Sequence, residues 1–377
     1  MTAIRRLPVL LAALLPAALA LAGCSPSPGE TAAAAAPGPI DEVLGTVDLT
    51  AVAGEPPAEE HRVAVLDVAA LDDGRAFVLL AGQDTRLVEV LPGEDAPVAG
   101  DVVALPALGR RASVHAVADG VLVVGSDDRG PLLLTVRDGE VTEQRLEHGG
   151  SVGSSVLSPD GSTLWIGLHA HEAADDVRLL AVDVATGRVT RGVALGPEFS
   201  ADAWPRELLP RPDGGVVAVV WDPSQDAAPD LVAEFDARLQ PAAEPWGVHP
   251  VIEEDVRRSA SVGVLPDGAV VVVSEYRDGS RVSVVRDGEL DTKAGVELIG
   301  DVPVVSAGPV PGSVTLLHAG GRSAVVSLDP MTGDLREEVP LCRELAVFAD
   351  LGLSADGTRG AAAGTCGDSD VVAVLVG

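Results

Sequence analysis

The sequence predicts an all-β fold, a seven-bladed β-propeller, and three observations lead to it. Asp-Gly turns recur at roughly regular intervals of about 40 to 55 residues, which is the period of propeller blades or of a solenoid. Short runs rich in Val separate the turns, and Gly, Pro and Asp residues lie between these runs. A strand-like segment before the first turn has no hairpin partner nearby, which suggests a closed ring.

The turns divide residues 60–377 into repeats. Each turn follows one apolar run and precedes another, and the second repeat contains four such runs at 113–118, 121–125, 132–137 and 141–146. Four short antiparallel strands in each repeat are typical of a propeller blade. The turns are Asp73-Gly74, Asp119-Gly120, Asp160-Gly161, Asp213-Gly214, Asp267-Gly268 and Asp356-Gly357, with Pro311-Gly312 as one substitute.

The last repeat lacks a fourth strand. It supplies apolar runs at 346–354, 360–365 and 371–376, after which the sequence ends. Residues 40–51 (IDEVLGTVDLTA) are the unpaired strand that fills this place, and pairing them there removes two exposed strand edges. We therefore predict seven blades with residues 40–51 as the outer strand of the seventh. Six or eight blades are the alternatives, because Pro311-Gly312 is a weak substitute for an Asp-Gly turn.

The third repeat carries a family resemblance. Residues 154–167 (SSVLSPDGSTLWIG) and 177–195 (VRLLAVDVATGRVTRGVAL) are similar to the repeats of YVTN-type and WD-like propellers, and residues 325–333 repeat the second motif. The resemblance implies a propeller scaffold and assigns no catalytic residue.

The N-terminus has the three parts of an export signal over residues 1–23. Arg5 and Arg6 precede an apolar stretch at 7–21 that is too short to span a membrane comfortably. Leu21-Ala22-Gly23-Cys24 resembles a bacterial lipobox, which implies that Cys24 is diacylated and becomes the new N-terminus. The alternative is ordinary secretion with an incidental cysteine. We expect lipid anchorage (a diacyl or palmitate-type anchor) on the extracytoplasmic side of the cell membrane.

Residues 24–39 predict a flexible tether, because prolines surround an alanine run with little apolar surface to pack. Residues 40–377 are then the propeller domain. Lys293 is the sole lysine among abundant Arg, Ala and Gly, which favours a high-GC bacterial source such as an actinobacterium.

Charge limits the partners. The formal net charge is −31, which argues against nucleic acid because its phosphates require a basic surface. We expect a monomer without a cofactor.

Cys342 and Cys366 flank strands of the seventh repeat, and export supplies the oxidising compartment that a disulfide between them requires.

Arginines and aromatic residues mark one candidate face. In a propeller, the loops that enter the inner strands and those between second and third strands share a face. Arginines at or just before predicted inner strands form a candidate anion-binding rim, with local ion pairs to neighbouring acids as the alternative. They are Arg62, Arg111, Arg206, Arg258 and Arg343.

Aromatic residues make up only 2% of the chain, yet several fall in or beside loops of the same face. Aromatic and arginine side chains often anchor interfaces. The alternative is packing between blades and bracing of loops. The residues are Phe199, Trp204, Trp221, Trp246 and Tyr276, and we predict ligand binding by Arg62, Arg111, Trp204, Arg206, Trp246, Arg258 and Tyr276.

No sequence motif indicates catalysis. A G-x-S-x-G elbow, a phosphate loop and a dinucleotide fingerprint are all missing from the sequence, and we assign no catalytic or metal-binding residue. His169, His171 and Glu172 share one acidic loop, but a second cluster that would complete a metal site is lacking. The leading hypothesis is a non-catalytic module that binds a protein, peptide or envelope ligand. The alternative is an exported hydrolase or lactonase-like enzyme, suggested by fold analogy alone.

Overall fold

The computed structural model describes residues 40–56, 62–169, 177–224, 230–248, 258–276, 279–290, 296–298, 304–306, 313–318, 323–332 and 334–377. Contacts divide the chain into two units, Met1–Ala36 and Pro37–Gly377. Residues 1–39, including Cys24 and the predicted signal and tether, lie outside the described residues. No helix within the described residues has the length and apolar character needed to cross a membrane.

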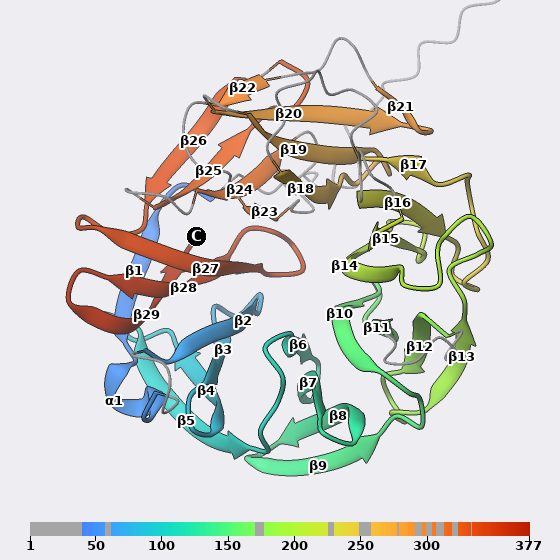
Figure 1. Ribbon diagram of the computed structural model, residues 1–377. Helices are drawn as coiled ribbons and strands as arrows, with labels where there is room; N and C mark the ends of the chain where they lie inside the picture. The colour runs from blue at the N-terminus through green and yellow to red at the C-terminus, as the bar shows by residue number, and fades with distance from the viewer. Residues whose placement is uncertain are drawn as a thin grey trace, which may run out of the picture. The chain divides into compact units, whose positions relative to one another are not determined.

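Seven antiparallel sheets build the second unit, and each is one blade of a propeller (Figure 1). In blades 1 to 6 the strands follow chain order from the innermost outward. Blade 1 contains β2 (Ala64–Ala70), β3 (Ala76–Ala81), β4 (Thr85–Leu91) and β5 (Val98–Leu105); blade 2 contains β6 (Ser113–Val117), β7 (Gly120–Asp127), β8 (Gly130–Arg137) and β9 (Glu140–Arg145); blade 3 contains β10 (Ser151–Leu157), β11 (Thr163–His169), β12 (Leu179–Asp183) and β13 (Val189–Val193).

The remaining blades repeat this order with one irregularity, because two short strands in blade 5 both pair with β20. Blade 4 contains β14 (Trp204–Pro210), β15 (Val216–Trp221), β16 (Asp230–Phe235) and β17 (Trp246–Gly247); blade 5 contains β18 (Arg258–Val264), β19 (Val270–Tyr276), β20 (Gly279–Arg286), β21 (Glu289–Leu290) and β22 (Val296–Leu298); blade 6 contains β23 (Val304–Ser306), β24 (Val314–His318), β25 (Ala324–Leu328) and β26 (Leu335–Pro340); blade 7 contains β27 (Ala346–Leu353), β28 (Gly360–Cys366), β29 (Ser369–Val376) and β1 (Val43–Asp48). The prediction of seven blades is confirmed.

Five of the six Asp-Gly turns share one hydrogen-bond pattern. In blade 3 the Asp160 carboxylate accepts the Ser162 N–H at 3.0 Å, and Gly161 has φ +68°, a conformation that glycine adopts without steric cost. The turns at Asp73, Asp213, Asp267 and Asp356 use the same carboxylate contact to the amide two residues on. The substitute turn at Pro311-Gly312 lies outside the described residues.

Strand β1 closes the ring by pairing antiparallel with β29. The register sets Thr46 opposite Val374, and the Asp41 N–H donates to the Gly377 carbonyl at 2.8 Å. This confirms that the N-terminal strand completes blade 7. The strand is shorter than the predicted 40–51, because the chain turns after Asp48 into the short helix α1 (Thr50–Ala53).

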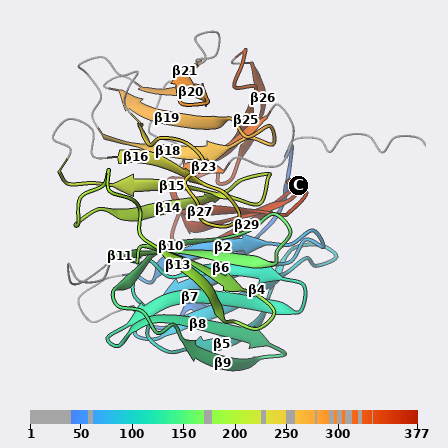
Figure 2. The ribbon, with the colours of Figure 1, turned by 90° about the vertical axis from the view of Figure 1, so that its right-hand side faces the viewer.

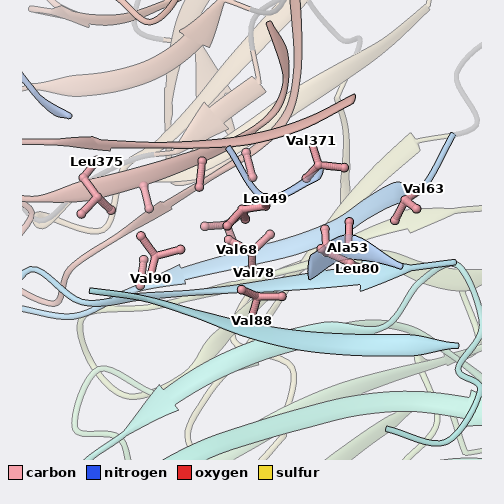
Figure 3. Packing of buried hydrophobic residues seen from close by; sticks show 14 residues of the cluster. Leu49, Ala53, Val63, Val68, Val78, Leu80, Val88, Val90, Val371 and Leu375 are labelled. Atoms are coloured by element: carbon pink, nitrogen blue, oxygen red, sulfur yellow. The ribbon is translucent and has the colours of Figure 1, made fainter. Parts of the chain in front are cut away.

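The seam between blades 7 and 1 is packed with aliphatic side chains (Figure 3). Leu49 is completely buried there, between Val371 of blade 7 and residues such as Val68 and Val78 of blade 1. Similar clusters of buried side chains fill the other seams between blades. Figure 2 shows the strands of successive blades from the side. Packing between blades therefore supplies the core.

A disulfide joins Cys342 to Cys366 within blade 7, with their Cα atoms 6.1 Å apart. Cys342 stands just before β27 and Cys366 ends β28, which pairs with β29. The bond links the segment that leads into the innermost strand of the closing blade to the end of the next strand, and the predicted disulfide is present.

We predict that Leu49→Ala lowers the free energy of unfolding by about 3 kcal/mol, because it removes a buried side chain from a packed seam. Leu44→Ala is the matched control, since Leu44 of β1 is 42% exposed, and it is expected to cost less than about 1 kcal/mol. Urea denaturation followed by circular dichroism measures both. Equal losses for the two variants would contradict the packing of this seam.

Candidate functional site

The strand order defines two faces of the propeller. The innermost strands begin, and the loops between second and third strands lie, at what we call the entry face. The Asp-Gly turns lie at the opposite end, the turn face. In blade 4, Trp204 begins β14 and pairs directly with Trp221, which ends β15. Both tryptophans therefore stand at the entry face, as predicted.

Four side chains from three blades meet at the entry face, and we call them the Trp204 cluster: Arg111, His169, Trp204 and Trp221. The Arg111 guanidinium lies 4.0 Å from the centroid of the Trp204 ring, which is a cation–π contact. The His169 and Trp221 ring centroids lie 5.1 and 6.4 Å from that of Trp204. Trp204 is buried, but Trp221 is 36% exposed, and Arg111 and His169 are also exposed. The cluster thus presents an aromatic and cationic surface.

Blade 3 makes room for this cluster. A Cβ atom on Gly153 would lie 3.0 Å from the Trp204 indole and 2.6 Å from the Pro205 carbonyl oxygen. Gly153 stands where the register of β10 shifts, between Val152 and Ser154. The missing side chain lets the start of β14 approach β10 closely.

Arg206 adds a second positive charge close by. Its Nε lies 3.2 Å from Oδ1 of the buried Asp230. Partial desolvation of the Arg111 guanidinium and, after it, the charge of Arg206 lower the pKa of Arg111. Arg111 itself has no ion pair with any described residue, so its charge is available to a ligand.

The structure does not bring all the predicted ligand-binding residues to this cluster. Trp246 lies in β17, the outermost strand of blade 4, and packs in the seam with blade 5. Arg62 and Arg343 are exposed in the loops before β2 and β27. The backbones of Arg258 and Tyr276 pair with Glu275 and Gly279 in blade 5. Of the predicted residues, Arg111, Trp204 and Arg206 come together, and His169 and Trp221 complete their surroundings.

A second group of residues lies on the walls of a central cavity of about 840 Å³. This group was not predicted from the sequence. We call Asp67, His115, Ser155, Glu207 and Asp350 the channel belt, and each comes from an innermost strand of a different blade. A signal for its carboxyl groups exists in the sequence. Asp67, Glu207 and Asp350 each stand six residues before the aspartate of an Asp-Gly turn.

Burial and a neighbouring acid both affect the carboxyl group of Asp67. Burial raises the pKa of Asp67 well above its ordinary value, and a hydrogen bond and charge repulsion from Asp350 raise it further. Asp67 also accepts the Val114 N–H at 2.6 Å and its neighbour Val68 N–H at 2.8 Å. The carboxyl group of Asp67 is therefore protonated more readily than that of an ordinary aspartate.

Burial shifts the pKa values of Glu207 and His115 in opposite directions. Burial raises the pKa of Glu207 to about 7, with Asp230 and Asp350 adding to the rise and Arg206 opposing it. Burial lowers the pKa of His115 to about 4, so the imidazole is neutral at neutral pH. His115 Nε2 and Ser155 Oγ form a hydrogen bond at 2.7 Å, which joins blades 2 and 3.

Metal-binding geometry is not found among the described residues, where no group of three or more His, Cys, Asp and Glu side chains could hold an ion. The loop containing His171 and Glu172 lies outside them. His169, which the sequence placed in that loop, ends β11 and contacts Trp204.

Comparisons with known proteins support the fold. No protein-family model matches the sequence, and no curated protein sequence does. Among solved structures, the chain is similar to the WD40 domain of Pan2 from Neurospora crassa, with a TM-score of 0.61 and 11% sequence identity over 89% of this chain and 94% of that one. At this identity the likeness shows a WD40-like β-propeller fold and transfers no activity.

We predict that Glu207→Gln changes how stability depends on pH. A carboxyl group with a raised pKa favours the folded state when protonated, so its contribution is present at pH 4 and is lost as pH rises through about 7. The variant should therefore gain stability over wild type between pH 5 and pH 8, by up to about 3 kcal/mol.

Urea denaturation at each pH measures this difference. Glu140→Gln is the control, because Glu140 is exposed on β9. Parallel stability curves for wild type and Glu207→Gln would show that Glu207 is ordinarily solvated.

Proposed function

We propose that this protein is a membrane-anchored extracytoplasmic bacterial lipoprotein whose propeller binds a protein, peptide or envelope ligand at its entry face. The observation that carries the binding site is the contact of Arg111 with Trp204, beside the partly exposed Trp221. Arginine and tryptophan are the residues most enriched at the energetic centres of interfaces. The propeller fold is consistent with a protein-binding scaffold.

The charge of the cluster indicates the polarity of the ligand. The chain carries a net charge of −31, yet Arg111 and Arg206 lie close together at the entry face and Arg111 has no described carboxylate partner. An anionic group of a ligand, such as a peptide carboxylate, would pair with Arg111 while apolar parts contact Trp221. The exported hydrolase or lactonase-like alternative rests on fold analogy alone.

Affinity capture from envelope extract tests the binding face. We expect full-length wild type to retain a partner that Arg111→Ala and Trp221→Ala lose by at least about tenfold, since interface anchors typically contribute more than about 1.4 kcal/mol. Arg343→Ala is the matched control, because Arg343 is an exposed arginine in another loop of the entry face. If all variants retain the same partners, the Trp204 cluster does not bind them.

The anchor rests on the N-terminal motif, Arg5, Arg6 and the apolar stretch before Leu21-Ala22-Gly23-Cys24. We expect wild type in cells to incorporate labelled palmitate and to sediment with membranes, because acyl chains partition into the bilayer. Cys24→Ser should do neither, whereas Cys342→Ser with Cys366→Ser should remain labelled. Labelled Cys24→Ser protein would contradict lipidation at this cysteine.

A further inference from the structure

The central cavity changes in character along its length. The channel belt lies within the innermost strands, whereas the residues that follow those strands are largely apolar and lie toward the turn face. These apolar lining residues are Leu71, Pro159, Pro212, Pro266 and Ala355. Asp72 and Ser158 are the polar side chains among the described residues of this part of the lining, so a ligand entering from the turn face would pass a mostly aliphatic wall before it reaches the channel belt.

Irregular pairing accompanies each carboxyl group of the belt. The register of the innermost strand shifts between Val65 and Asp67 in β2, between Pro205 and Glu207 in β14, and between Phe348 and Asp350 in β27. Such bulges redirect side chains and are frequent beside functional sites. The same local irregularity thus accompanies an acid on the cavity wall in three separate blades.

The chemistry of the wall selects the charge of the ligand. No lysine or arginine occurs among the described lining residues, so an anion would find no cationic partner there. Apart from the imidazole of His115, the described lining also has no aromatic ring, and a sugar or a nucleobase would lack a stacking surface. Acids and aliphatic groups remain, which suit a cation with an aliphatic body.

Glu207 supplies the acceptor that the other acids lack. Asp67 uses its oxygens to accept the N–H groups of Val68 and Val114, and Asp350 accepts the Leu351 N–H at 2.8 Å. The side chain of Glu207 has no hydrogen bond with any described residue, although it is only partly accessible. Its carboxylate is therefore the group to which a ligand N–H would donate.

We propose that the central cavity binds a small organic cation, with its ammonium or guanidinium head at Glu207 beside Asp67 and Asp350, and its aliphatic body along the wall toward the turn face. The cavity volume of about 840 Å³ is in the range of small-molecule sites. This site is separate from the Trp204 cluster and differs from it in charge. Experiments can therefore disprove ligand binding at one site while binding at the other stands.

Isothermal titration of the full-length protein in detergent tests the proposal, with micelles alone as the blank. The probes are pentylammonium, the neutral pentanol and the anionic pentanoate, which share one aliphatic chain. We expect pentylammonium to bind with one-to-one stoichiometry and at least about tenfold more tightly than either analogue. No saturable heat with pentylammonium, or equal binding of pentanol, would overturn the proposal.

Two substitutions locate the site. Glu207→Gln keeps the shape of the side chain and should weaken pentylammonium binding at least about tenfold. Asp350→Asn should weaken it as well, and melting curves establish that each variant is folded. Arg111→Ala and Glu140→Gln should bind like wild type, since Arg111 is at the entry face and Glu140 is exposed on blade 2. Unchanged affinity in both acid variants would place the cation elsewhere and overturn the proposal.

The affinity should also depend on pH. The charged groups that interact electrostatically with Glu207 are Arg206, Asp230 and Asp350, and the cavity wall also carries the titratable groups Asp67, Asp72 and His115. Because the pKa of Glu207 is raised to about 7 and that of His115 is lowered to about 4, Glu207 ionises between pH 6 and pH 8 while His115 stays neutral. Pentylammonium should bind up to about tenfold more tightly at pH 8 than at pH 6, because a larger fraction of Glu207 is ionised at pH 8. Equal affinity at both pH values would exclude a role for the Glu207 charge.

Discussion

Antiparallel pairing of β1 with β29 is the constraint on which the rest of the structure depends. Each blade buries its faces against the two neighbouring blades, and without β1 the edge of β29 in blade 7 would be exposed. The pairing covers that edge and brings Leu49 into the seam between blades 7 and 1, which is a core like the others. The Cys342–Cys366 disulfide lies in the same blade and covalently fixes two of its strands.

Closure of the ring also explains why two chemically different sites coexist. The entry face joins loops from several blades, which brings Arg111, His169 and Trp204 from blades 2, 3 and 4 into contact. The innermost strands face one another across the cavity, which gathers single acids from blades 1, 4 and 7. Neither grouping exists within one blade. Arg111 and Arg206 thus lie close together at the entry face, while acids collect on the cavity wall.

The blade count could be predicted because the Asp-Gly turn is a local structure. An aspartate that accepts a nearby amide and a glycine with positive φ require only residues adjacent in sequence, as at Asp160-Gly161. The entry face was partly predictable, because Arg111 and Trp204 stand next to strand starts. Trp246 has a similar loop-like sequence context, but its segment forms the outermost strand of the blade, and sequence does not distinguish the inner edge from the outer. The channel acids were missed, because a bulge that directs Glu207 to the cavity looks like an ordinary strand residue in the sequence.

The partners at the seam of blade 7 are far apart along the chain. Asp48 accepts a hydrogen bond from Ser369 at 3.1 Å across a separation of 321 residues. A ribosome therefore synthesises β1 long before its partner, and the first strand must remain unpaired while the other blades are made. Contacts of such long range form late and slowly, because a large loop must close first. The ring consequently cannot close until β29 has been synthesised.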